Sequence, residues 1–434
     1  MQHHSWITRM KTIFLERFKI SIKLHIVPTT FRVIYGYMRK EEVTLKLQPV
    51  SLNNRIPTLD ILRGISLFGI LLVNIIAFYV PMPHVTDLSN WFTAAKDIIN
   101  YQYIEIYVQS SFYPLFSILF GYGLAMQYRK ATEQQARFYP FATKRLVILF
   151  LLGMLHAYFI WWGDILATYA FCGLFLLLFI RMKPIFLLIV AFLLNGGFHI
   201  YYLNLIKGIL HIEVLVQPVD ITQVQNSITA YGTGSWLDSF NQRLVDLSIQ
   251  MQPFMWFVAL VTILPYMLVG VALAKWKLIE QASQYKKVWL ALAVVGVSVG
   301  LFIKNAPILF TRTYLLDYLK VYVGGPILAL GYIATIIVIC SFIPKAINVF
   351  KPFAKLGRMS LTMYLMQSII LSVLFYNWGF GLYGHVDVEL GIYISVAIIL
   401  AQIALAELWF MKFKQGPIET IVKKLTYAKM LSEK

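Results

Sequence analysis

The sequence predicts an all-α protein, a polytopic transmembrane helical bundle of about ten spans with both termini cytoplasmic. Its composition is the first reason, because 59% of the 434 residues are hydrophobic and only 13% are charged, about half the charged share of a soluble globular chain. The second is the recurrence of apolar runs of about 20 residues, the length that crosses a bilayer as a helix. The third is the position of the basic residues, which lie mostly between these runs. Soluble enzymes and disordered or fibrous chains are excluded.

The excess of basic residues has the same explanation. The chain has 38 Lys and Arg against 20 Asp and Glu, a net charge of +18, which on a soluble domain would suggest nucleic-acid binding. Here the basic residues fill short segments between apolar runs, with no stripe of basic and stacking aromatic side chains. Nucleic acid is therefore not an expected partner. Cys172 and Cys340 both lie in apolar runs, so neither a disulfide framework nor a cysteine metal site is expected.

The first segment, residues 1–54, is predicted to be a basic cytoplasmic segment. Basic residues interrupt its apolar positions, so a cleaved signal peptide is not expected. Trp6, Phe14 and Phe18 recur at near-helical spacing, which is typical of a helix lying on an anionic inner leaflet. The alternative is an upstream extension before a natural start at Met38.

The rest of the chain divides into two membrane halves. Residues 55–205 form the first half with five spans, and residues 251–410 form the second half with five more. Between them, 206–250 is predicted to be an extracytoplasmic loop, and 411–434 a basic cytoplasmic tail. The predicted spans lie near 59–80, 104–127, 145–162, 164–181, 184–205, 253–275, 287–303, 321–343, 359–377 and 389–410.

The basic residues set the orientation of these spans. With the N-terminus inside, 31 of the 38 Lys and Arg fall in cytoplasmic segments and six in outside segments, which agrees with the positive-inside rule. Residues 304–320 are the exception, with three basic residues on the predicted outside, and a re-entrant piece is one explanation.

Polar residues share one stripe of the first span. Asp60, Arg63 and Asn74 lie within about 60° of one another on a helical wheel. An unpaired Arg in a membrane costs about 3 kcal/mol, so Arg63 should face the bundle with Asp60 as its partner. Asn74 lies about 16 Å further along the helix. The stripe suits a route between a cytoplasmic donor and an outside acceptor; the alternative is an ion pair with one Asn that bridges helices.

The third span carries an imidazole at membrane depth. His156 follows Arg145 by eleven residues, hence about 16 Å from the inner face. Ionisable residues at such depth indicate function, and His suits proton transfer near neutral pH. Asp164 follows at the predicted outer turn, where it could orient an imidazole or cap the next helix.

Further candidates lie on a loop and in the ninth span. His84 lies on an outer loop, either near a site or solvated. Arg358 stands at the inner edge of the ninth span, and Tyr364 and Gln367 lie within it, either lining a cavity or joining helices. The chain lacks motifs for metal or nucleotide hydrolysis, so no metal is expected.

Six segments together resemble the YeiB-like family of bacterial membrane proteins, also called domain of unknown function 418. The resemblance covers roughly residues 55–428. Its motifs are LDILRGISLFGILLVNIIAF (59–78), SFYPLFSILFGYGLAM (111–126), LLGMLHAYFIWWGDIL (151–166), GRMSLTMYLMQS (357–368), FGLYG (380–384) and QGPIE (415–419).

The resemblance implies a function. The family is grouped with transmembrane acyltransferases, including the lysosomal heparan-α-glucosaminide N-acetyltransferase, which is similar over the first span. This implies acyl transfer from a cytoplasmic acyl-CoA, with acetyl-CoA expected, to a hydroxyl or amine of a glycan or lipid on the far side. In that relative an Asn and a His follow the shared Arg-Gly motif, and Asn74 and His84 occupy comparable places. His156 and Asp164 lie in the YeiB-like motif itself.

The leading hypothesis is thus a multi-pass acyltransferase of the cell membrane. His156 or His84 would be the general base, Asn74 would hold the reacting carbonyl, and Arg63 or Arg358 would bind donor phosphate. Asp60, Tyr364 and Gln367 complete the predicted substrate-binding set.

Two other hypotheses remain open. A transporter or exporter of a small metabolite would use the polar stripe of the first span as a path. A scaffold for envelope proteins would use residues 206–250 as its contact surface. The expected partners are the bilayer, a small-molecule, glycan or lipid acceptor, and a second copy of the chain in a homodimer.

Overall fold

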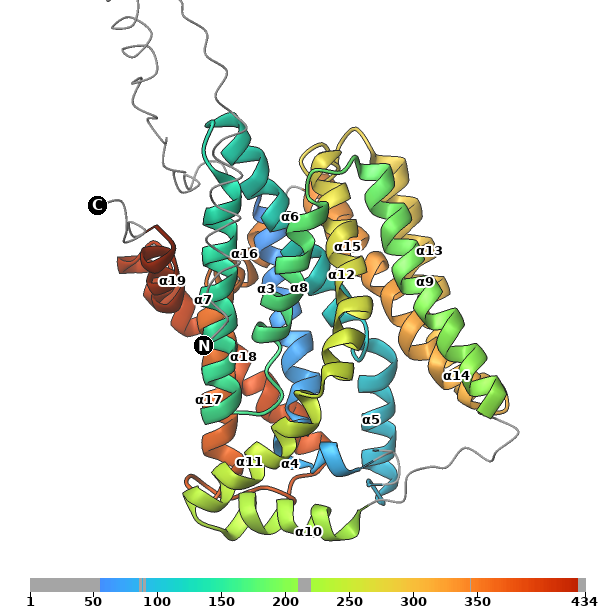
Figure 1. The fold of residues 1–434 in the computed structure, drawn as a ribbon, viewed down its shortest axis with the longest axis vertical. Helices are drawn as coiled ribbons and strands as arrows, with labels where there is room; N and C mark the ends of the chain where they lie inside the picture. The colour runs from blue at the N-terminus through green and yellow to red at the C-terminus, as the bar shows by residue number, and fades with distance from the viewer. Residues whose placement is uncertain (1–54, 86–87, 89–90, 210–219, 344, 428–434) are drawn as a thin grey trace, which may run out of the picture. The chain divides into compact units, whose positions relative to one another are not determined.

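The computed structural model describes residues 55–85, 88, 91–209, 220–343 and 345–427, and these belong to one unit that spans Leu47–Lys434. Helices dominate the described residues, and no strand occurs among them (Figure 1). The predicted N-terminal segment 1–54, with its surface helix, lies outside them. In the first half the helices are α3 (Pro57–Asn74), α4 (Ile76–Tyr79), α5 (Ala95–Tyr107), α6 (Phe112–Glu133), α7 (Phe138–Phe159), α8 (Leu166–Phe179) and α9 (Pro184–Ile209).

The second half follows a helical connection. Short 3-10 and π turns occur at Met82–His84, Thr229–Thr233 and Lys320–Gly324. The remaining helices are α10 (Ile221–Ile228), α11 (Trp236–Gln250), α12 (Pro253–Lys275), α13 (Lys286–Leu309), α14 (Tyr314–Leu319), α15 (Gly325–Phe342), α16 (Ala346–Arg358), α17 (Ser360–Phe375), α18 (Val388–Lys412) and α19 (Pro417–Tyr427).

The protein is a multi-pass membrane protein. Seven of the described helices are long and apolar enough to cross a bilayer, or eight if the bent pair α16 and α17 is one span. Each of the ten predicted segments contains a helix, but two fall short of that standard. Helix α8 has 14 residues, about 21 Å of helix, and α6 carries polar side chains such as the buried Ser117. Since α6 packs within the bundle against α12 and α3, its polar groups avoid lipid.

Glycines bring the central helices into close contact. A Cβ atom on Gly64 of α3 would overlap the backbone carbonyl of Phe353 in α16, and one on Gly357 would overlap that of Asp60. Small residues let membrane helices approach this closely and pack by van der Waals contact. The same contact fixes the N-terminal end of α3, which carries Asp60 and Arg63, beside α16.

Helix α17 starts at a sharp break. Its axis is bent by 77° from that of α16, and Met359 between them has φ −125° and ψ 37°. The free N–H groups at the new helix start need acceptors. Glu419 of α19 supplies one, because its Oε1 accepts from the N–H groups of Leu361 (2.8 Å) and Thr362 (3.1 Å). The C-terminal helix is therefore part of the bundle.

Two of the three basic residues that broke the charge pattern, Lys304 and Lys320, are buried, and Arg312 is exposed. Lys304 is in α13, and its Nζ donates to the carbonyl of Gln109 at 2.5 Å. Lys320 pairs with Glu105 at 3.0 Å. Around them the described chain is helical, and the bent helix pair lies elsewhere, at α16 and α17. Residues 304–320 are the end of α13, a short connection and α14, and the re-entrant piece suggested for them stays a prediction.

The predicted loop 206–250 is largely helical where it is described. Helices α10 and α11 lie across one end of the bundle, next to α4 and the start of α5 (Figure 1), and we call them the cap. Asn377 holds this cap, since its Nδ2 donates to the carbonyls of Ala230 and Ser235. Residues 210–219 are outside the described part of the connection.

Candidate functional site

His156 and Asp164 form a buried pair. They lie near the end of α7 and just before α8, so the tight turn between these helices brings them together. Nδ1 of His156 is 2.8 Å from Oδ2 of Asp164, and the two residues are only 2% and 4% exposed. Gly153 makes this possible, because it leaves space where a Cβ atom would stand 2.7 Å from Oδ1 of Asp164.

Asp164 is surrounded by hydrogen-bond donors. Its Oδ1 accepts from the N–H of Ala167 at 2.7 Å, and Oδ2 accepts from the hydroxyl of Tyr364 at 3.2 Å. Asp164 thus combines the two roles predicted for it, at the helix start and beside an imidazole. An ionised carboxylate only accepts hydrogen bonds, so this arrangement assigns the proton to Nδ1 of His156. Nε2 is then a buried acceptor without a described partner.

A cavity of about 430 Å³ lies on the other side of Tyr364. This is within the range of small-molecule sites. Its walls come from α3, α6, α7, α8, α16, α17 and α19. Tyr364 lines the cavity, and its ring centroid is 5.3 Å from that of His156. The imidazole therefore lies directly behind the cavity wall.

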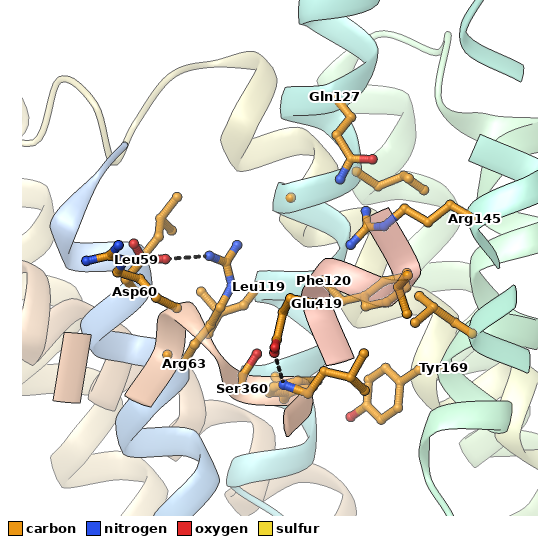
Figure 2. Close-up of a pocket in the computed structure, with 18 of the residues that line it drawn as sticks. Leu59, Asp60, Arg63, Leu119, Phe120, Gln127, Arg145, Tyr169, Ser360 and Glu419 are labelled. Atoms are coloured by element: carbon orange, nitrogen blue, oxygen red, sulfur yellow. Dashed lines mark hydrogen bonds and ion pairs between the residues drawn. The ribbon is translucent and has the colours of Figure 1, made fainter. Parts of the chain in front are cut away.

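The charged residues of the cavity are mostly basic. Five cationic side chains line it against two carboxylates, an excess of three positive charges. In Figure 2 the guanidinium groups of Arg63 and Arg145 extend from α3 and α7 toward the space between them. The charged lining residues are Arg55, Arg63, Arg145, Arg358, Lys423, Asp60 and Glu419.

The two acidic residues are already engaged. Asp60 accepts from Arg63 at 2.9 Å, as the sequence predicted, and is also 3.5 Å from Arg55. Glu419 caps α17. Among the described residues Arg358 donates to the carbonyl of Lys414 and Lys423 to Oε1 of Gln415, whereas Arg145 makes no hydrogen bond or ion pair, so its charge is the one most available to a bound anion.

Comparison with known proteins places the chain in a family. It is 33% identical over 398 residues to the uncharacterized protein YxaH of Bacillus subtilis (strain 168), which covers 88% of this chain and 96% of that protein. The model of the family described as Protein of unknown function (DUF418) matches residues 273–429. The chain belongs to the DUF418 family.

Other relatives agree. The uncharacterized protein YeiB of Escherichia coli (strain K12) is 28% identical over 401 residues, 85% of this chain and 95% of that protein. An uncharacterized 39.9 kDa protein from the amylase 3' region of Bacillus acidopullulyticus is 25% identical over 88% of this chain and 96% of its own. No solved structure matches the chain.

The motifs that carried the family resemblance meet at the cavity. Five of the six contribute lining residues, although they are spread between residues 59 and 419. The sixth, 380–384, lies elsewhere, where the N–H of Gly384 donates to the carbonyl of Tyr79. The family sequence pattern is thus concentrated around one site.

Besides His156 and Asp164, three predicted site residues do not line the cavity: Asn74, Gln367 and His84. Asn74 is the last residue of α3 and lines no part of the cavity. Gln367 joins α17 to α18, because its Nε2 donates to Oε1 of Gln402 at 2.9 Å. Gln402 in turn donates to the carbonyl of Met363. Of the two predicted roles for Gln367, the structure shows the helix-joining one.

His84 belongs to a second buried cluster, under the cap. Its Nε2 is 2.9 Å from Oδ1 of Asp246, which also accepts from Gln242. The solvated loop histidine that the sequence suggested was therefore wrong. Tyr231 donates to Oδ2 of Asp246 at 2.7 Å. Burial and, to a lesser degree, the Asp246 carboxylate raise the pKa of Tyr231 above its usual range, which keeps the phenol a donor.

The sequence analysis missed several residues of both sites. Arg145 served only as a depth marker, and Asp246 was merely one acidic residue of the connection. Arg243 is 1% exposed and donates to the carbonyls of Tyr158 and Phe159, at the end of α7. A periodicity search on 236–250 would have shown that these polar residues share one helical face. No group of metal ligands occurs among the described residues.

Proposed function

We propose that the protein is a transmembrane acyltransferase that moves an acyl group from acyl-CoA to a hydroxyl or amine acceptor. The observation that carries this proposal is the cavity itself, which is basic at Arg63 and Arg145 and reaches Tyr364. Tyr364 shares the Asp164 carboxylate with His156. The arginines thus lie on the cavity side of Tyr364, and His156, oriented by Asp164, lies on its other side.

The basic side chains would hold the donor. Arginine binds phosphate through paired N–H groups, and coenzyme A carries phosphates at the end remote from its thioester. With the phosphates at Arg63, Arg145 and Arg358, the acyl chain would extend along the apolar wall of the cavity. Acetyl-CoA is the donor we expect.

His156 would act as the general base. The acceptor oxygen or nitrogen attacks the thioester carbonyl carbon, and its proton passes to Nε2 of His156. The C–S bond then breaks, and the same proton passes to the sulfur of coenzyme A. Asp164 keeps the proton on Nδ1 and stabilises the imidazolium that forms. His84 is paired with Asp246 in the cluster under α10 and α11, whereas His156 lies next to Tyr364 of the cavity wall, so the proposal gives the base to His156 alone.

The acceptor would approach from the outer face of the cell membrane. We propose ten crossings, which add α6 and α8 to the helices that meet the span criteria, with both termini in the cytoplasm. In this orientation the arginine cluster opens toward cytoplasmic acyl-CoA, and the cap of α10 and α11 faces outward. The acceptor class is a glycan or lipid that presents a hydroxyl or amine.

Donor binding can be tested on the purified full chain in detergent. A ligand that binds only the folded state raises the melting temperature, so acetyl-CoA and free coenzyme A should both raise it. Arg145→Gln should weaken coenzyme A binding about 10- to 100-fold, the effect of losing a charge-assisted hydrogen bond. Lys287→Gln is the matched control, because Lys287 is exposed at the start of α13.

Transfer is the second measurement. Radioactive acetyl-CoA with membrane extracts should yield a labelled lipid or glycan with the native chain. If no acyl-CoA or coenzyme A changes the melting temperature, or if Arg145→Gln binds coenzyme A as well as Lys287→Gln does, this proposal fails.

One observation favours transport as a second candidate. The break between α16 and α17 lies beside the cavity, and broken helices line substrate sites in many transporters. In that case labelled substrate would cross the proteoliposome membrane without chemical change. An acylated product recovered in the same assay would instead support the enzyme.

A further inference from the structure

Helix α19 has an exposed face that is both apolar and basic. Ile421 and Leu425 lie one turn apart and are 51% and 50% exposed, and Lys424 beside them is also exposed. On the opposite side Val422 and Thr426 are buried. Such a helix, half packed on the bundle and half apolar toward the outside, requires a neighbour that accepts both kinds of side chain.

The position of α19 identifies that neighbour. Helix α18 is a candidate span that ends at Lys412, and α19 starts at Pro417. The turn is fixed, because the ring of Trp409 stacks on Phe413 at 4.3 Å and its Nε1 donates to the carbonyl of Gln415. Figure 1 shows α19 lying across the end of α18, beside α7. A helix that begins so soon after a span ends lies at the level of the lipid headgroups.

We propose that this face of α19, with the turn before it, binds anionic phospholipids. The apolar side chains would enter the boundary between headgroups and acyl chains, and the lysines would reach the phosphates. Lys412, Lys414 and Lys424 are all exposed, and each basic residue near an anionic leaflet strengthens binding about five-fold. The surface consists of Lys412, Phe413, Lys414, Ile421, Lys424 and Leu425.

The bound lipid would also support the cavity. Val422, Lys423 and Thr426 of the same helix line it from the other side. Lipid contact thus presses α19 onto the bundle and holds one cavity wall in place. This inference does not depend on acyl transfer, because it concerns a different face of the helix.

The test places a fluorophore on the surface. Leu425→Cys in the full chain is labelled with an environment-sensitive dye, while Cys172 and Cys340 are buried and remain in place. In nanodiscs of equimolar phosphatidylcholine and phosphatidylglycerol, spin-labelled lipid should quench this dye. The control is Ser283→Cys, which is exposed in the turn between α12 and α13 and should stay unquenched. Equal quenching at the two positions, or none at 425, overturns the inference.

A charge variant tests the preference for anionic lipid. Spin-labelled phosphatidylglycerol should quench the dye at 425 more than spin-labelled phosphatidylcholine does. Adding Lys424→Gln should reduce that preference about five-fold, whereas adding Lys287→Gln should leave it unchanged. Identical quenching by the two lipids in the Leu425→Cys protein would show that the surface does not select anionic lipid, against the proposal.

Discussion

The pair His156 and Asp164 shows how few atoms define the candidate site. The carboxylate accepts from Nδ1 of His156, from Tyr364 and from the N–H of Ala167. Each bond fixes a different element, so the imidazole has one orientation. The Asp164 carboxylate is fully engaged by these donors, so removing one member of the network leaves the others unpaired.

At the residue scale, His156→Gln should abolish most acyl transfer. Glutamine forms hydrogen bonds but cannot take up the acceptor proton, and general-base catalysis contributes roughly a hundred- to ten-thousand-fold. Coenzyme A should still raise the melting temperature, because His156 does not line the cavity. Initial transfer rates measure the effect, with His385→Gln, in an exposed loop, as control. Native-like transfer by His156→Gln would remove this residue from the mechanism.

The sequence allowed the local part of this site to be predicted. Asp164 follows His156 by eight residues across a turn, and Asp60 lies one helical turn from Arg63, so spacing alone brought both pairs together. Tyr364 was selected for its polarity within a span, but its contact with Asp164 joins residues 200 positions apart. Such a contact depends on how α17 packs against the turn between α7 and α8, which no local pattern contains.

At the scale of elements, the contact of α7 with α8 depends on a missing side chain. A Cβ atom at Gly153 would overlap the backbone N of Ala167 and crowd Asp164. The same residue type elsewhere has no such role, since a Cβ atom at Gly197 of α9 would meet nothing within 4 Å. The two glycines therefore form a matched pair.

Gly153→Ala should destabilise the protein by about 1–3 kcal/mol, the usual cost of overpacking, and should reduce transfer by moving Asp164 from His156. Gly197→Ala should be neutral or stabilise by up to about 1 kcal/mol, because alanine favours helices. Unfolding of both variants in the same detergent gives the free energies. If the Gly153→Ala protein were as stable and as active as Gly197→Ala, the contact between α7 and α8 would tolerate the added methyl group, against this prediction.

Elements were predicted better than their ends or roles. Apolar runs located the spans, but the break at Met359 and the helical cap of α10 and α11 were not predicted, since both depend on distant partners. Glu419 had been noted only within a motif, whereas its carboxylate completes the start of α17. Lys304 and Lys320 departed from the positive-inside rule because both are buried. Lys304 donates to a backbone carbonyl and Lys320 pairs with Glu105.

At the scale of the whole molecule, orientation is the open property that most affects function. The proposed topology puts Ser283 in the cytoplasm and Asn241, exposed on α11, on the outside. Asn241→Cys in intact cells should react with a membrane-impermeant maleimide, and Ser283→Cys should react only after permeabilisation. Gel-shift labelling measures both. The reverse pattern would put the arginine cluster outside and exclude cytoplasmic acyl-CoA as donor.

The capping of α17 by Glu419 also bears on biosynthesis. Helix α19 follows every spanning helix in the sequence, so α3, α7 and α17 enter the membrane before their cavity has its last wall. The start of α17 must wait for Glu419, with its N–H groups held by water or lipid until then. The cavity therefore cannot be complete while the ribosome is still translating the spans, and a chain that ended before residue 419 would lack this wall.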